Sequence, residues 1–298
     1  MLFFPTKNGS SIMLRVLRSS FFLLMALIVI FYGLPAVADC KIGIMQSRRG
    51  DAQKFKPLMD YLNDKGFRNS LIAAPNYPNA ARMFANGEID AMFSGSAIAA
   101  ILIAKGLTRP VVRPVSSDGQ STYWAVVIAA KGAPPFTGSV NYFSDKRLIF
   151  TPLASAGEIF YYSLPGRVDR DSVTVMKAAS HSAALDSLNR GMADVAIIKN
   201  RVWDKDRFQF STLEKVGEDH GENPDNTLLV SVKMDKWTLD QLTNILLGVH
   251  NDQSELAKQV RASLEIQGFI RTTEKDFKHS FLLLKRAGMN SAFDFTLP

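Results

Sequence analysis

Residues 89–106 read IDAMFSGSAIAAILIAKG. The apolar run Ala91–Phe93 predicts a short buried strand, and Ser96–Lys105 has the length and composition of a helix. Gly106 suits the C-terminus of that helix, because glycine adopts the left-handed backbone conformation without strain. The strand therefore enters the helix through a junction of small and hydroxyl residues, Ser94-Gly95-Ser96. Repeated strand–helix units of this kind build an α/β fold.

The same alternation extends in both directions from this segment. We expect further strands at Cys40–Met45, Leu71–Ala74, Val111–Val115, Tyr123–Ala130, Leu148–Thr151, Val173–Lys177, Ala193–Ile198 and Leu228–Val232. We expect further helices at Lys54–Lys65, Asn79–Asn86, Ala156–Leu164 and Ser182–Arg190, and a helical chain from Thr238 onward. The order predicts largely parallel sheets. The series restarts after the turn Lys131–Pro135, which indicates two α/β lobes.

The N-terminal segment differs from the rest of the chain. Arg15 and Arg18 precede the apolar run Phe21–Tyr32, and Ala36-Val37-Ala38 follows it. This order is typical of a secretory signal peptide over residues 1–38 with cleavage after Ala38, and the alternative is an uncleaved signal anchor. Met13 is an alternative to Met1 as the start, because it would bring the two arginines near the N-terminus.

The charge pattern gives no support to nucleic-acid binding. The formal net charge is +7, and loss of a signal peptide carrying three basic residues and no acid would leave +4. No basic stripe with interleaved aromatics occurs. Cys40, the single cysteine, excludes an intrachain disulfide. We interpret it as a spectator thiol near a mobile terminus; lipidation is the alternative, although Asp39 precedes it where lipoproteins have a small residue.

The common catalytic motifs are absent. The sequence has no G-x-G-x-x-G, G-x-x-x-x-G-K-[ST] or G-x-S-x-G segment, and its four histidines lack metal-ligand spacing. We therefore expect no enzyme, no metal and no cofactor.

Three strand–helix junctions carry hydroxyl residues: Ser94–Ser96, Thr151–Gly157 and Ser180–Ser182. Helix N-termini present unpaired N–H groups and partial positive charge, and hydroxyls add donors. Each serine alone could simply cap its own helix. Three such junctions over two lobes favour a shared site for an anion, because ligands bind at the carboxyl ends of strands in open α/β sheets.

Several segments resemble a known family. The quoted matches are Phe55–Leu62, Asn86–Gly95, Ser155-Ala156-Gly157 and Ser180–Ala196, the last similar to "sHxaaLxavxnGxaDvA". Together they resemble the periplasmic phosphate/phosphite/phosphonate-binding proteins of ABC transporters. The resemblance implies a two-lobed type II periplasmic-binding-protein fold with a ligand cleft between the lobes. Lobe 1 would comprise residues 39–127 and 228–298, and lobe 2 residues 128–227.

The resemblance also implies the ligand-binding residues. The oxyanion would be bound by Thr151, Ser155, Ala156, Gly157, His181, Ser182, Ser94 and Ser96. His181 would contribute more at low pH if its protonated form donates. Tyr123 could line the cleft or only pack at the hinge.

Two positions depart from the family pattern. An apolar residue near Ile98 stands where the family often has tyrosine, and Lys199 stands where it often has an aspartate suited to a ligand amine. Both argue against an aminoalkylphosphonate ligand. Lys199 could instead select a second anionic group, or could be a solvated surface residue.

The resemblance thus implies a monomeric periplasmic solute-binding protein that delivers a small anion to a membrane ABC permease. One alternative is a periplasmic sensor that reports ligand occupancy to a membrane histidine kinase. A small-metabolite enzyme of the same fold is another.

Overall fold

The computed structural model describes Met1 and residues 39–45, 51–75, 77–151, 155–167, 172–290 and 292–293. The chain from Cys40 onward forms one compact unit. Apart from Met1, the expected signal peptide and its cleavage site lie outside the described residues. Among the residues that are described, no helix is long and apolar enough to cross a membrane.

The first lobe is built on a six-stranded sheet in the order β13-β4-β12-β3-β1-β2. Its strands are β1 Cys40–Met45, β2 Asn69–Ala74, β3 Ala91–Ser94, β4 Thr108–Ser116, β12 Thr227–Ser231 and β13 Ile266–Arg271. β1 pairs in parallel with β2 and β3, whereas β12 is antiparallel to β3 and β4, and β13 is antiparallel to β4. The sheet is therefore mixed, and the expectation of a largely parallel sheet is wrong here.

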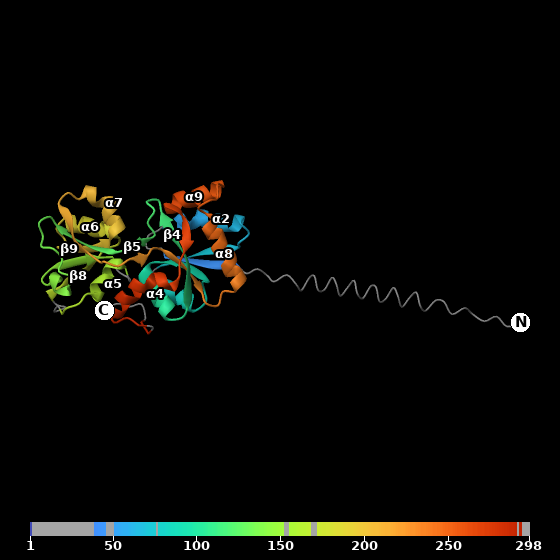
Figure 1. The fold of residues 1–298 in the computed structure, drawn as a ribbon, viewed down its shortest axis with the longest axis horizontal. Coiled ribbons are helices and arrows are strands. Elements are labelled where there is room, and N and C mark those ends of the chain that lie inside the picture. The colour runs from blue at the N-terminus through green and yellow to red at the C-terminus, as the bar shows by residue number, and fades with distance from the viewer. Residues whose placement is uncertain are drawn as a thin grey trace. The chain divides into compact units, whose positions relative to one another are not determined.

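Helices cover both faces of this sheet (Figure 1). They are α2 Lys56–Asp64, α3 Tyr77–Ala85, α4 Ser96–Ala104, α8 Lys236–Gly248, α9 Glu255–Leu264 and α10 Lys278–Arg286, with 3-10 turns η1 Asp51–Phe55 and η5 Glu274–Phe277. Alternation along β12 explains the two layers: Leu228 and Val230 join the core under α2, α8 and α9, while Leu229 joins the core under α3, α4 and α10. α4 is buried on every side from Ser96 to Ile103.

The second lobe is built on a five-stranded sheet in the order β10-β6-β9-β7-β8. Its elements are β6 Ala125–Ala130, η2 Val140–Phe143, β7 Arg147–Phe150, α5 Ala156–Ser163, β8 Thr174–Lys177, α6 His181–Asn189, β9 Val195–Lys199, α7 Asn200–Asp206, η4 Arg207–Gln209 and β10 Leu213–Glu218. β7 is parallel to β8 and β9, and β6 is antiparallel to β9 and β10. This sheet is also mixed. α6 and α7 cover one face, and α5 covers the other.

Two short strands join the lobes. β5 Thr122–Tyr123 pairs antiparallel with β11 Asn223–Pro224 in a separate two-stranded ribbon. The expected single strand Tyr123–Ala130 is thus interrupted at Trp124, whose backbone N–H donates to Asn200 Oδ1 at 3.1 Å. All of β6 lies in the second sheet, so we propose that the chain crosses between lobes at β5 and returns at β11, rather than crossing after residue 127.

The expectation of a helical chain from Thr238 onward is wrong over one segment. Ile266–Arg271 forms β13, which pairs with β4 at the edge of the first sheet. Glu265 ends α9 in the left-handed conformation, with a φ of 54°, and so turns the chain out of the helix. Burial of Ile266 and Phe269 then holds the segment on the sheet.

Candidate functional site

The first-lobe junction places two hydroxyls in the protein interior. Ser94 ends β3 and Ser96 begins α4, and both are buried. The N-cap residue of α4 is Gly95, which is extended and provides no side-chain cap. Ser96 Oγ and Tyr123 Oη share a hydrogen bond of 2.5 Å. The first turn of α4 is therefore tied to the β5 strand of the hinge.

Tyr123 links this junction to the second lobe. Its side chain is 3% exposed, and burial raises the pKa of its phenol. The Nζ atom of Lys199, at the end of β9, lies 4.2 Å from the centre of the Tyr123 ring, within the range of a cation–π contact. Tyr123 thus packs at the hinge and also contacts side chains from both lobes, so that both roles considered for it from sequence are compatible with its position.

In the second lobe, two candidate residues come together directly. Thr151 follows β7 and His181 begins α6, and Thr151 Oγ1 lies 3.3 Å from His181 Nδ1. The expected loop Thr151–Gly157 includes residues 152–154, which lie outside the described residues. Its far end is described: Ser155 Oγ caps α5 by accepting a hydrogen bond from Glu158 N at 3.2 Å.

Ala156 and Gly157 form the start of α5. A Cβ atom at position 157 would overlap the carbonyl oxygen of Ile197 in β9. Only glycine therefore lets this helix approach β9 as closely as it does. The helix also contacts α4 of the first lobe.

His181 and Ser182 differ in their surroundings. Burial, reinforced by the charge of Lys199, lowers the pKa of His181 to about 3. The ring is therefore neutral near pH 7, and the protonated form considered from sequence is not the donor there. Ser182 is exposed, and its hydroxyl donates to Asp206 Oδ2 at 3.0 Å on α7. Ser180, rather than Ser182, caps α6 by accepting from Ala183 N.

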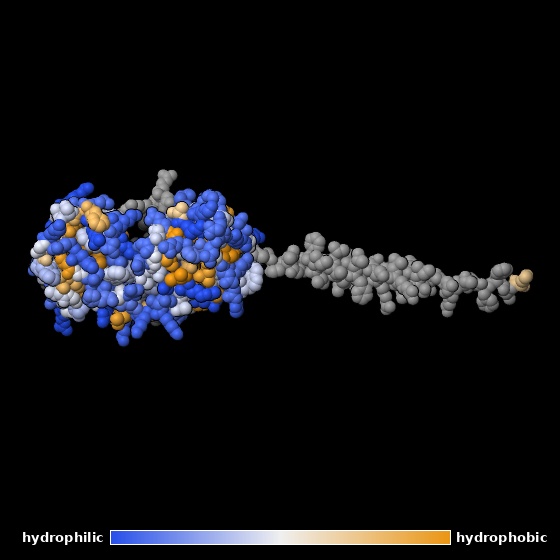
Figure 2. All heavy atoms as spheres, turned by 45° about the horizontal axis from the view of Figure 1, so that its top comes forward, coloured by the Kyte–Doolittle hydropathy of each residue, from blue (hydrophilic) through white to orange (hydrophobic). Residues whose placement is uncertain are grey.

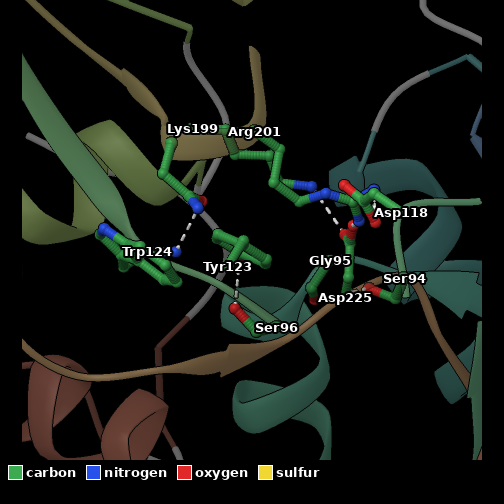
Figure 3. Close-up of polar contacts among 10 residues, drawn as sticks. Ser94, Gly95, Ser96, Asp118, Tyr123, Trp124, Lys199, Arg201 and Asp225 are labelled. Atoms are coloured by element: carbon green, nitrogen blue, oxygen red, sulfur yellow. Dashed lines mark hydrogen bonds and ion pairs between the residues drawn. The ribbon is translucent and has the colours of Figure 1, made fainter. Parts of the chain in front are cut away.

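Lys199 is part of an ion-pair network between the lobes (Figure 3). Its ammonium lies 2.6 Å from Asp225 Oδ1, and Arg201 Nη1 lies 3.0 Å from Asp225 Oδ2. Arg201 Nη2 is 3.5 Å from Asp118 Oδ1. Burial raises the pKa of Asp225, but Lys199 and Arg201 outweigh this and hold the pKa below its ordinary value. Lys199 is thus a paired cation, which does not fit the alternative of a solvated surface lysine.

Arg201, Asp118 and Asp225 complete this network, and none of them is a candidate residue on sequence grounds. Asp225 follows β11 and Asp118 lies between β4 and β5, so both belong to connections near the hinge, whereas Arg201 is in α7 of the second lobe. No local pattern in the sequence brings these segments together. The run Lys199-Asn200-Arg201 is the one local signal, because it begins on the last residue of a buried strand and so places two cations at the carboxyl end of β9.

A space-filling view shows a hollow between the two lobes, rimmed mostly by hydrophilic residues (Figure 2). A separate cavity of about 970 Å³ lies between α10 and the second lobe; it is lined by Phe136, Phe160, Asp219, His279 and Arg286, among others. None of the candidate residues lines this cavity. Two of its lining residues contact each other, with His279 Nε2 2.8 Å from Asp219 Oδ2.

The arrangement is suited to binding rather than to bond cleavage. It combines hydroxyls, a neutral imidazole, helix N-termini and paired cations, which are hydrogen-bond donors for an oxyanion. In the part of the chain that the structure describes, no group of three or more histidine, cysteine or acidic residues could hold a metal ion.

Comparison with solved structures gives the same fold at low sequence identity. XAC2383 from Xanthomonas citri bound to chloride ion has a TM-score of 0.71 at 15% identity, covering 83% of this chain and 98% of that one. PhnD1 from Prochlorococcus marinus (MIT 9301) in complex with methylphosphonate has a TM-score of 0.68 at 14% identity, covering 85% and 99%.

A third structure is similar to the same extent. The binding protein component of an ABC phosphonate transporter (PA3383) from Pseudomonas aeruginosa has a TM-score of 0.64 at 15% identity, covering 83% of this chain and 85% of that one. These likenesses confirm the predicted two-lobed type II fold. None of the curated protein sequences matches this chain.

A family model described as "ABC transporter, phosphonate, periplasmic substrate-binding protein" matches residues 44–277. The match covers most of the chain, including both lobes and the hinge strands. Proteins of this family bind substrates for ABC transporters and are not enzymes, which confirms that expectation from the sequence. The chain belongs to the family of periplasmic substrate-binding proteins of phosphonate ABC transporters.

Proposed function

We propose that this protein is the solute-binding component of an ABC transporter and binds a small oxyanion, such as phosphate, phosphite or a phosphonate, between its lobes. The observation that carries the proposal is the pair of contacts across the hinge that connect Ser96, Tyr123 and Lys199. Ser96 of the first lobe bonds to Tyr123, whose ring contacts Lys199 of the second lobe. His181, whose pKa is lowered by burial and by the charge of Lys199, lies beside Thr151.

Within this proposal, the oxyanion contacts Thr151, Ser155, Ala156 and Gly157 from one side and Ser94 and Ser96 from the other. His181 and Ser182 at the start of α6 complete the second-lobe contribution. Tyr123 and Lys199 lie where the two sets meet. Because the contacts come from both lobes, ligand binding favours the closed arrangement by its difference in affinity for the two states.

A thermal-shift screen of the purified protein against phosphate, phosphite, alkylphosphonates, sulfate and sulfonates tests the proposed ligand class. Calorimetry then measures the affinity of each anion that raises the melting temperature. Small-angle scattering at saturation should show a smaller radius of gyration than the ligand-free protein. If no oxyanion shifts the melting temperature, the proposed ligand class is wrong; an unchanged radius contradicts a cleft shared by the lobes.

The proposal includes export by the N-terminal segment and monomeric release into the periplasm, where the protein would meet its membrane permease. N-terminal sequencing of material from the periplasm should give a chain that begins at Asp39. A full-length chain, or a lipid on Cys40, would contradict this part of the proposal. Sedimentation of the mature chain should give the mass of one copy.

A further inference from the structure

Four charged side chains meet where the second lobe reaches the hinge. Lys199 and Arg201 come from the second lobe, and Asp225 and Asp118 come from the connections beside β11 and β5. Figure 3 shows the Arg201 side chain extending toward Asp118 and Asp225, near the Ser94-Gly95 segment. The charges of these four groups cancel. His181, the nearby titratable ring, adds no charge near pH 7 because its pKa is about 3.

Asp225 is held firmly as the partner of the two cations. Its side chain is 10% exposed, and both carboxylate oxygens are paired, one with Lys199 and one with Arg201. The Asn226 backbone N–H also hydrogen-bonds to this carboxylate. An entering anion that displaced Asp225 would leave a buried carboxylate without its partners, which is strongly unfavourable. We therefore expect Asp225 to stay in place when a ligand binds.

Two buried polar atoms near this network have no hydrogen-bond partner within the described residues. Within the described residues, Arg201 Nε is buried and has no hydrogen-bond partner. Thr227 Oγ1 is likewise buried without a partner, and Thr227 pairs with Ser94 where β12 meets the end of β3. Buried polar atoms almost always have partners, so Arg201 Nε and Thr227 Oγ1 are two hydrogen-bonding groups beside the candidate residues whose capacity is unused, as it is for Asn69 Oδ1, Thr108 Oγ1 and Arg109 Nε elsewhere in the described residues.

We propose that Asp225 and Asp118 compensate Lys199 and Arg201 so that the cleft selects a singly charged tetrahedral oxyanion over a doubly charged one. This inference rests on the proposed function and names the ligand's charge. The hydroxyl and N–H donors of the site can bind the oxygens of a singly or a doubly charged anion. The second negative charge of a doubly charged anion, however, has no cation in the network whose charge is not already compensated. It also lies close to the buried Asp225 carboxylate, and like charges in a poorly hydrated site repel strongly.

Methanesulfonate and methylphosphonate provide the test, because they have the same shape and differ in charge. Calorimetry is performed at a pH high enough to ionise methylphosphonate twice. The wild-type protein should bind methanesulfonate at least tenfold more tightly than the methylphosphonate dianion. Asp225→Asn removes one negative charge and should shift the ratio of the two affinities toward the dianion by at least tenfold.

Two further variants show whether a change in the affinity ratio comes from the charges of this network. Asp118 is 55% exposed, so Asp118→Asn should fold and should shift the ratio in the same direction by a smaller factor. Asp194→Asn is the matched control: Asp194 pairs with Arg147 beyond the other end of β9, and its loss should leave the ratio unchanged. Circular dichroism confirms that each variant is folded before its affinities are measured.

The outcomes separate this inference from the proposed function. Tighter binding of the methylphosphonate dianion by the wild-type protein overturns the charge selection and leaves the proposed function standing, as does an unchanged ratio in both Asp225→Asn and Asp118→Asn. Failure of methanesulfonate to bind also overturns it. Failure of every oxyanion in the thermal-shift screen overturns the proposed function itself.

Discussion

Ser96 and Tyr123 share a hydrogen bond of 2.5 Å that joins the first turn of α4 to hinge strand β5. Both side chains are buried, so neither hydroxyl can exchange this partner for bulk water. The Tyr123 ring faces the Lys199 ammonium at the same time. A single side chain at the hinge therefore contacts a helix N-terminus of one lobe and a cation of the other, so a change at Tyr123 should affect both stability and binding.

Tyr123→Phe should lower the free energy of unfolding by about 1–3 kcal/mol, because it leaves the Ser96 hydroxyl buried without a partner. Because phenylalanine keeps the ring contact with Lys199, any loss of anion affinity in this variant would be due to the missing Tyr123 hydroxyl. Urea unfolding and calorimetry measure the two effects. Ser96→Ala in the Tyr123→Phe background should cost little more, since the shared bond is already lost.

Tyr142→Phe is the control for this pair. Tyr142 Oη donates to Pro134 O at 2.9 Å in the second lobe, away from the hinge. Its loss should reduce stability without changing affinity. If Tyr123→Phe and Ser96→Ala are fully additive, the hydrogen bond is not an energetic link between α4 and β5.

Ser155→Ala should weaken both the protein and its anion binding. Loss of an N-cap serine costs about 1 kcal/mol of stability. A lost hydrogen bond to a charged ligand is worth about 1.5–3 kcal/mol, which corresponds to a ten- to hundredfold weaker affinity. Ser254→Ala removes the equivalent cap of α9, where Ser254 Oγ accepts from Ala257 N at 3.3 Å. The control should lose stability alone; equal affinities in both variants would place the anion elsewhere.

His181 should make the protein less stable in acid. Its pKa is about 3 in the folded protein, whereas the ordinary histidine value is 6.5. Between these values the unfolded chain binds a proton that the folded chain rejects, so the free energy of unfolding falls as pH decreases from about 6.5 toward 3. His181→Asn should flatten this dependence, as measured by urea unfolding at a series of pH values.

A second histidine variant and the pH dependence of anion affinity test the role of His181 independently. His250→Asn changes an exposed histidine and should retain the wild-type dependence on pH. The affinity for methanesulfonate, whose charge is constant, should not increase through His181 as the pH is lowered to 5. An increase that disappears in His181→Asn would mean that the imidazolium binds the ligand.

The Cys40 thiol should be unreactive in the native protein. The expectation of a thiol near a mobile terminus is wrong, because Cys40 is the first residue of β1 and its side chain is buried. Burial, with a smaller contribution from Asp90, raises its pKa to about 12, so almost no thiolate exists near neutral pH. A thiol reagent should label the protein only after denaturant is added, and rapid stoichiometric labelling without denaturant would contradict this.

The residues show why the fold was easier to predict than the site. The strands and helices around Ala91–Lys105 follow from hydrophobic periodicity, which is a local property of the sequence. The sequence around β13 predicts a helix instead, because only pairing with the distant β4 makes Ile266–Arg271 a strand. Asp225 meets Lys199 through the return crossing at the hinge, a contact that neither segment encodes alone.

The last prediction concerns the charge at position 199. Lys199→Asp would place a second carboxylate beside Asp225, while Arg201 would stay paired with Asp225. The variant should lose affinity for methylphosphonate and methanesulfonate alike, because a compensating cation has become an anion. It should gain affinity for an aminoalkylphosphonate, whose ammonium can occupy the position of the lysine Nζ. Repulsion between the two carboxylates should also lower stability at neutral pH.

Lys199→Met separates the loss of a cation from the gain of an anion. It should weaken both simple anions without creating a site for an amine, and Arg201 should still hold Asp225. Calorimetry with 2-aminoethylphosphonate and ethylphosphonate, which share a carbon chain, gives the comparison directly. If Lys199→Asp leaves the ratio of these two affinities unchanged, the side chain at position 199 does not face the ligand, and its contacts with Tyr123 and Asp225 serve only to hold the hinge.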